Sequence, residues 1–260
     1  MRNEVTMTAM RPHGPDPLED EPPSWRGELV VGDLWASWRG AAGDAAPHRH
    51  LAAQAVIAPM GACVVDGEGQ RHGATVILID PLVRHALLPI VEAQILFVEQ
   101  GAIGAPAVAP LLESIRAARD TIAIIGPPEA GFWRAWLDGE ARSSPWPPPG
   151  SERLADLIDR LAPLGLLRLE TAASAFGLSS SRFRHRFSES FGLPFRRYVL
   201  WRRLRLAAVA MMQGADATDA AHAAGFADQS HYARTLRAVF GVTAGQALSK
   251  PRLAPGSRVS

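Results

Sequence analysis

One 23-residue pattern occurs twice in the last part of this chain, and it constrains the fold more than any other feature. The copies read ETAASAFGLSSSRFRHRFSESFG and DAAHAAGFADQSHYARTLRAVFG, and their capping residues, Ser179 and Asp228, lie 49 residues apart. Each copy predicts a short Ala-rich helix, a turn with glycine, a cap and an amphipathic helix. Small residues such as Ala172 and Ala221 let the two helices approach closely, as a helix-turn-helix unit requires.

Polar and apolar residues separate on the second helix of each copy. Phe183 and Phe187 share an inward face in the first copy, as do Tyr232 and Leu236 in the second. Arg and His can donate to guanine in the major groove, and Ser can bond base edges or phosphates. Arg-rich faces are also often merely solvated. The predicted DNA-binding residues are Ser181, Arg182, Arg184, His185, Ser230, His231, Arg234 and Arg237.

The charge of the chain is distributed unevenly. Residues 151–260 carry 16 Lys plus Arg against 8 Asp plus Glu, whereas residues 1–150 carry 11 against 18. A basic segment that contains two helix-turn-helix patterns suits a polyanion, and the acidic half does not. The expected partner of the C-terminal half is therefore double-stranded DNA.

Over about residues 151–248 the sequence resembles the AraC/XylS family of transcription regulators. The strings GLSSSRFRHRFSESFGLPFRRYV, RRLRLAA and GFADQSHYARTLRAVFGVTAGQ carry the resemblance. It implies two helix-turn-helix units joined by a rigid helix, Phe195 to Met212. It further implies that the second helix of each unit enters one of two adjacent major-groove segments. It also implies that the base-facing residues are Ser181, Arg184, His185, Ser230, His231 and Arg234.

Three arginines of the joining helix, Arg202, Arg203 and Arg205, have two possible roles. They could pair within the protein, with Asp219 or Glu189 as partners, or they could contact DNA phosphates. The sequence favours neither role.

The N-terminal half has the spacing of a β domain. Short apolar or alternating stretches at residues 28–31, 53–58, 75–79 and 94–98 are separated by Gly, Pro and Asp, which is typical of a sandwich or small barrel. From Pro110 the spacing becomes helical, and residues 110–137 could form a dimerisation surface or pack within the domain. The overall fold class is therefore α+β, with a β domain and following helices, then an all-α domain with two helix-turn-helix units.

The segment GDAAPHRHLAAQAVIAPMG suggests a binding site in the β domain. His48 and His50 lie on one face of a strand, and Gln54 follows at the offset of the first cupin motif, while His85 lies roughly where the second motif would place it. AraC-type regulators frequently resemble cupins in their effector domain, so these four residues are candidates for effector binding. Because Gln54 replaces the acidic ligand of that motif and the other spacings are irregular, we predict a degenerate cupin with no metal or cofactor.

The predicted organisation is a disordered lead-in at residues 1–25, a cupin-like effector-binding or dimerisation domain at 26–140, a Pro-rich linker at 141–150, the DNA-binding domain at 151–250 and a disordered tail at 251–260. No signal peptide or membrane span is expected, and the single cysteine, Cys63, fits a reducing compartment, so we expect a cytoplasmic protein. No nucleophile elbow or phosphate-binding loop indicates catalysis. Two alternatives remain: a metal-dependent cupin enzyme fused to a DNA-binding domain, and an effector-independent DNA-binding protein.

Overall fold

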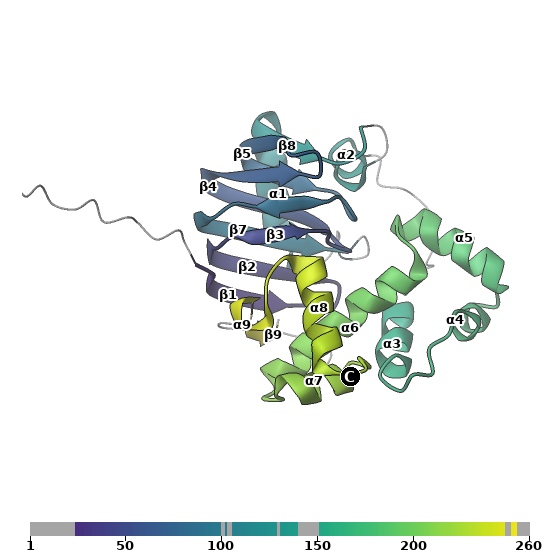
Figure 1. Ribbon diagram of the computed structural model, residues 1–260. Helices are drawn as coiled ribbons and strands as arrows, with labels where there is room; N and C mark the ends of the chain where they lie inside the picture. The colour runs from purple at the N-terminus through teal and green to yellow at the C-terminus, as the bar shows by residue number, and fades with distance from the viewer. Residues whose placement is uncertain are drawn as a thin grey trace, which may run out of the picture.

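A computed structural model describes residues 24–99, 102, 106–128, 131–139, 151–247 and 251–253. It shows a mixed β-sheet followed by a group of helices, so the α+β class is confirmed (Figure 1). The nine strands of the described residues are β1 (Arg26–Val31), β2 (Trp35–Ala42), β3 (Ala45–His48), β4 (Ala53–Asp66), β5 (Arg71–Ile79), β6 (His85–Leu87), β7 (Ile90–Val98), β8 (Ile122–Ile125) and β9 (Pro251–Leu253).

The strands form one sheet in the order β3-β6-β4-β7-β2-β1-β9, and β5 pairs with both β4 and β8. The four stretches predicted as strands lie in β1, β4, β5 and β7. Alternation along β7 sends Leu96 and Val98 to one face and Ile95 and Phe97 to the other. The strands form a single mixed sheet. That this domain is cupin-like stays a prediction.

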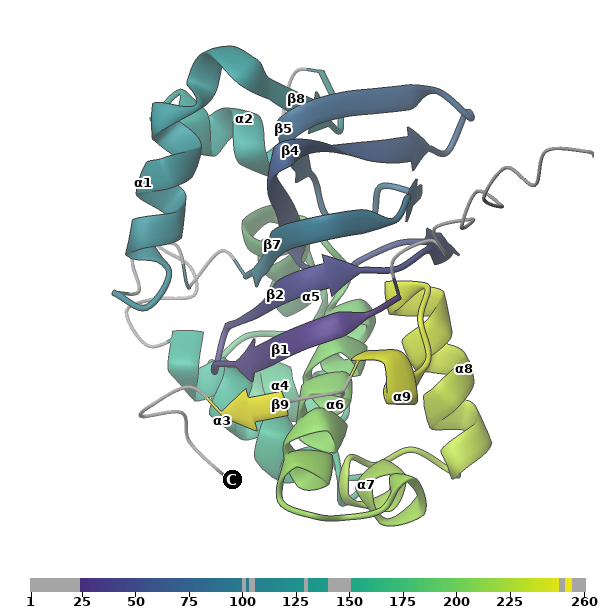
Figure 2. The ribbon, with the colours of Figure 1, turned by 90° about the vertical axis from the view of Figure 1, so that its left-hand side faces the viewer.

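Two short helices cover one face of the sheet. Helix α1 (Ala109–Ala117) and helix α2 (Phe132–Leu137) bury Leu112, Ile115 and Trp133 against Leu96 and Val98 (Figure 2). Between them lie the single turn η2 (Arg119–Thr121) and β8. The prediction that residues 110–137 are helical is therefore wrong for β8, which pairs in parallel with β5.

Two predicted end segments also need correction. Residues 251–253 are not part of a disordered tail, because β9 pairs in parallel with β1. Trp25, which the sequence places in the disordered lead-in, packs edge-on against Trp38 with ring centroids 5.3 Å apart. The remainder of the lead-in, the linker at 141–150 and the end of the tail lie outside the described residues.

The C-terminal helices follow the sequence prediction closely. They are α3 (Ser151–Leu161), α4 (Leu169–Ala175), α5 (Ser180–Phe191), α6 (Phe195–Met212), α7 (Ala217–Ala223), α8 (Gln229–Phe240) and α9 (Ala244–Ala247). The predicted caps are confirmed, since Ser179 Oγ accepts from Arg182 N at 3.3 Å and Asp228 Oδ1 accepts from His231 N at 2.7 Å. Both recognition helices end at a glycine in the left-handed region, Gly192 and Gly241.

One apolar cluster joins the sheet to these helices. It runs from Ile95 and Phe97 in the sheet to Trp201 and Leu204 of α6 and Leu236 of α8. At the same junction, Ala46 N of β3 donates to the Gly241 carbonyl at 3.2 Å. The C-terminal end of α8 is therefore fixed against the β domain. Within the described part of the chain, no helix is both long and apolar enough to cross a membrane.

Candidate nucleic-acid interface and interdomain pocket

The first recognition helix, α5, presents its predicted face to solvent. Its four predicted DNA-binding residues are exposed: Ser181, Arg182, Arg184 and His185. On the opposite side, Phe183 and Phe187 are fully buried and meet the Phe195 ring edge-on at 5.2 and 5.3 Å. The phenylalanines thus anchor α5 to α6, and the basic face is left open.

The second recognition helix, α8, is exposed along most of its predicted face. Ser230, Arg234 and Arg237 are exposed, whereas His231 is half-buried and its ring lies edge-on to Phe226 at 5.3 Å. The N-terminal turn of α8, the part that enters the groove in helix-turn-helix proteins, lies on the surface. The C-terminal end of α8 contacts β3 of the β domain.

Three further arginines stand exposed beside α5 and were not assigned from the sequence. Arg186 lies on α5 itself, and Arg196 and Arg197 lie in the first turn of α6. Exposed guanidinium groups next to a recognition helix suit phosphate contacts, which position a protein on DNA without reading its sequence. The sequence could have pointed to these three arginines, because they lie in the segment GLSSSRFRHRFSESFGLPFRRYV that carries the family resemblance.

The question left open for the arginines of α6 is answered by burial. Arg202 and Arg205 are 2% and 8% exposed, so neither can reach a phosphate. Arg202 donates to both carboxylate oxygens of Asp159 on α3, Nε to Oδ1 at 2.9 Å and Nη2 to Oδ2 at 2.5 Å. Arg205 Nη2 donates to Asp33 Oδ1 at 2.7 Å. Pairing with carboxylates within the protein is therefore confirmed for Arg202 and Arg205, though with Asp159 and Asp33 in place of Asp219 and Glu189. Arg203 is half-buried and donates from Nη2 to the Ala162 carbonyl at 3.2 Å.

Glu99, at the end of β7, completes this buried network. Its carboxylate accepts from Tyr198 Oη at 2.6 Å and from Trp201 Nε1 at 2.8 Å, and Arg202 Nη1 lies 3.5 Å away. Burial raises the pKa of Glu99, and the Arg202 charge and the two hydrogen bonds oppose that rise. Tyr198, Trp201 and Arg202 belong to α6, so the network ties the helix that joins the two units directly to the sheet.

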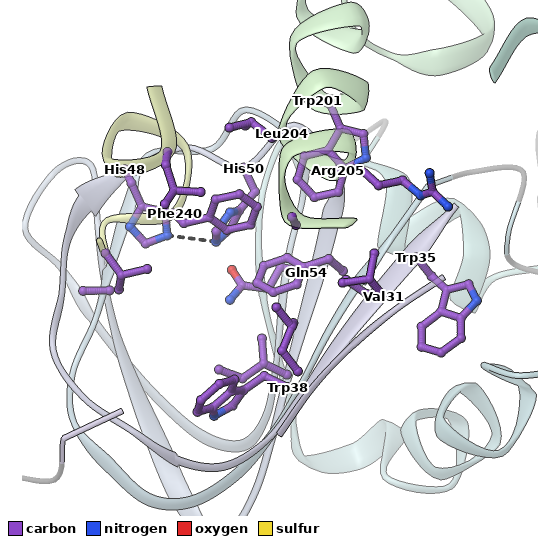
Figure 3. Close-up of a pocket in the computed structure, with 18 of the residues that line it drawn as sticks. Val31, Trp35, Trp38, His48, His50, Gln54, Trp201, Leu204, Arg205 and Phe240 are labelled. Carbon is purple, nitrogen blue, oxygen red and sulfur yellow. Dashed lines mark hydrogen bonds between the residues drawn. The ribbon is translucent and has the colours of Figure 1, made fainter. Parts of the chain in front are cut away.

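A pocket of about 110 Å³ lies between the β domain and the DNA-binding helices (Figure 3). Its wall is mainly apolar and draws on both halves of the chain, including Trp38, Phe97, Trp201, Leu236 and Phe240. Among the described residues, three buried polar atoms of its lining make no hydrogen bond of normal geometry: Trp38 Nε1, His50 Nδ1 and Gln54 Oε1. The pocket therefore combines an apolar surface with a few unsatisfied polar groups, as small-molecule sites do.

Three of the four candidate effector residues, His48, His50 and Gln54, line this pocket, and the fourth, His85, converges with the other two histidines. His48 and Gln54 lie on β3 and β4, His50 follows β3, and His85 on β6 pairs in register with His48. The ring centroid of His48 lies 4.4 Å from those of both His50 and His85. All four side chains are buried.

Burial keeps these three histidines neutral at ordinary pH. It lowers the pKa of His48 to about 4 and that of His85 to about 3, and it lowers the pKa of His50 well below its usual value. Charge repulsion from His48 lowers the pKa of His50 and of His85 further, and repulsion from His85 adds to the effect at His50.

Comparison with known proteins identifies the C-terminal region. Residues 172–250 match the family model of a helix-turn-helix domain. No curated protein matches the chain. Among solved structures, ToxT from Vibrio cholerae is 12% identical with a TM-score of 0.48, and the match covers 83% of this chain and 97% of that one.

The isolated C-terminal domains of two response regulators are also similar. The C-terminal domain of the response regulator yesN from Fusobacterium nucleatum is 22% identical, with 37% of this chain and 94% of that one covered and a TM-score of 0.33. The C-terminal domain of AraT, a response regulator from Geobacillus stearothermophilus, is 16% identical, with 41% and 89% covered and a TM-score of 0.34. The identification of the C-terminal region depends on the matched family model and on the two helix-turn-helix units, whose second helices, α5 and α8, are capped by Ser179 and Asp228. Residues 172–250 therefore form a helix-turn-helix domain of the AraC type.

Proposed function

We propose that this chain is a sequence-specific DNA-binding transcription regulator that responds to a small molecule held in the interdomain pocket. The matched family is a DNA-binding one, and the observation that supports sequence reading is the pair of capped recognition helices with exposed basic faces. The eight predicted DNA-binding residues on α5 and α8 stay a proposal, and among them Arg184 and Arg234 are the side chains best suited to guanine.

Replacing Arg184 or Arg234 with alanine should weaken binding to a selected DNA site by about 1 to 3 kcal/mol and relax its sequence preference. Each guanidinium stands on an exposed face and is the donor we assign to a base edge. Selection of bound sites from a random DNA pool, followed by titration of wild type and variants, would measure both effects.

Arg160→Ala is the matched control, because Arg160 is an exposed arginine of α3 outside both recognition helices. That variant should bind like wild type. If Arg184→Ala and Arg234→Ala both kept wild-type affinity and site preference, the assignment of these two faces would be wrong.

The support for an effector is the location and chemistry of the pocket. Side chains from α6 and α8 form part of its wall, so a ligand there would touch the DNA-binding helices as well as the sheet. Its volume of about 110 Å³ is below the roughly 150 Å³ of an engineered cavity that binds benzene, which favours a small, mostly apolar molecule. An acceptor group on that molecule could bond Trp38 Nε1, and a donor could bond Gln54 Oε1.

A small-molecule screen by thermal shift on the full chain tests this pocket. Ring-sized compounds with one hydroxyl or amide group should raise the melting temperature, because they bind only the folded state. Trp38→Phe removes the Nε1 donor and keeps most of the ring, so it should reduce the shift. A shift unchanged in Trp38→Phe and in Gln54→Leu would place the ligand elsewhere.

A further inference from the structure

The nitrogen atoms of the three buried histidines cannot all find hydrogen-bond partners. His48 Nδ1 lies 2.7 Å from the Ala46 carbonyl and His85 Nδ1 lies 3.0 Å from the Val83 carbonyl. Because a carbonyl only accepts, both Nδ1 atoms carry the proton, and the Nε2 atom of each neutral ring is a bare lone pair. His85 Nε2 has no hydrogen-bond partner.

His50 does not resolve this shortage. Its Nε2 lies 2.8 Å from His48 Nε2, which is a lone pair, and the Val239 carbonyl, which only accepts, also acts on the ring. If His50 Nε2 carries the proton, the lone pair falls on Nδ1, which is buried and makes no hydrogen bond of normal geometry. If Nδ1 carries it, two Nε2 lone pairs face each other at 2.8 Å. In either tautomer His50 and His85 leave buried lone pairs without a donor, an arrangement that usually costs about 1 to 3 kcal/mol for each group.

We propose that His48, His50 and His85 form a binding site for a divalent transition metal such as Zn²⁺. A cation is the partner that accepts several lone pairs at once, and imidazole nitrogen suits zinc and its neighbours in the first transition row. One ring nitrogen from each histidine lies within 4.8 Å of the other two. Tetrahedral zinc needs ligand nitrogens about 3.3 Å apart, so small ring rotations bring the three into place.

The surroundings of the rings also resemble those of metal ligands. A histidine that binds a metal usually donates its other N–H to a backbone carbonyl, as His48 and His85 do here. The rings are neutral, so they need lose no proton before they bind an ion. Three protein ligands leave a fourth position for water or another group.

This site lies directly beneath the end of the second recognition helix. A Cβ on Gly241 would come 2.7 Å from His48 Nδ1, and the His50 ring lies 5.3 Å from that of Phe240. The Val239 carbonyl of α8 is close enough to act on the pKa of His50. A bound ion would therefore hold β3 and the following loop in the form against which α8 packs.

The sequence predicts no metal because Gln54 replaces the acidic ligand of the cupin motif and because the other spacings are irregular. The structure weakens both reasons, because strand pairing brings His48 and His85 together despite the spacing, and three converging imidazoles form a sufficient ligand set without a carboxylate. This inference does not depend on the proposed DNA-binding function, and its test uses no DNA.

Metal binding is measured on the full chain after treatment with a chelator. Zn²⁺ titrated against a chromophoric chelator should occupy one site per chain, and Co²⁺ should give the strong visible absorption of a four-coordinate ion. His50→Gln and His85→Gln should each weaken Zn²⁺ binding at least 100-fold. His222→Gln, which changes an exposed histidine of α7, is the control and should bind like wild type.

Two measurements on the wild type remain decisive even if a histidine variant fails to fold. Zn²⁺ should raise the melting temperature, because the ion binds the folded state. It should also slow amide exchange at Gly241 and in the last turn of α8. Absence of a stoichiometric site in the wild type, or unchanged binding in both folded variants, would overturn the proposal.

Discussion

Replacing Asp159 with alanine should lower the free energy of unfolding by about 3 to 5 kcal/mol. The Asp159 carboxylate accepts two hydrogen bonds from Arg202, and Arg205 Nη1 lies 3.4 Å from it. Both arginines are almost completely buried, so the variant would leave their charge poorly compensated inside the protein. Chemical denaturation of the full chain followed by circular dichroism would measure the loss.

The control for this variant is Asp156→Ala, which removes an exposed carboxylate from the same helix and should cost less than about 1 kcal/mol. A second comparison separates the effect of losing the whole Asp159–Arg202 ion pair from the effect of leaving one charge buried without its partner. The double variant Asp159→Leu with Arg202→Met removes both charges and should be much closer to wild type than Asp159→Ala. Equal losses in Asp159→Ala and Asp156→Ala would contradict a stabilising role for the network.

Acid should destabilise the metal-stripped chain well above the pH at which exposed carboxylates titrate. The pKa of His48 is about 4 in the folded protein, below the ordinary value of 6.5, so the unfolded chain binds more protons between these values. The contribution to stability is complete above pH 6.5 and falls as the pH drops. By pH 4 the loss from His48 alone should be about 3 kcal/mol.

The loss of stability in acid that comes from the histidines can be separated from the loss that comes from protonation of carboxylates. His85, whose pKa is about 3 in the folded protein, contributes in the same direction. His85→Leu removes one of the titrating rings, so stability in denaturant should fall less steeply between pH 7 and 4 than in wild type. His222→Gln should keep the wild-type slope. Identical slopes in His85→Leu and wild type would show that the cluster does not control acid stability.

The recognition helices were predictable because their signals are local. The caps Ser179 and Asp228, the spacing of Phe183 and Phe187, and the terminal glycines act within a few residues of the helix that they define. The strands β1, β4, β5 and β7 were found for the same reason. In contrast, the short apolar run of β8 is a strand only because β5 lies beside it.

The candidate site divides in the same way. The sequence by itself determined most of the side chains of α5 and α8 that face solvent, with the half-buried His231 as the exception, and it singled out His48, His50, Gln54 and His85. Only the tertiary structure decided that Arg202 is bound by Asp159 and Glu99, since these partners lie on α3 and at the end of β7. It also decided that the histidines converge beneath α8, because strand pairing and helix packing join segments far apart in the chain, and no local pattern of residues encodes such contacts.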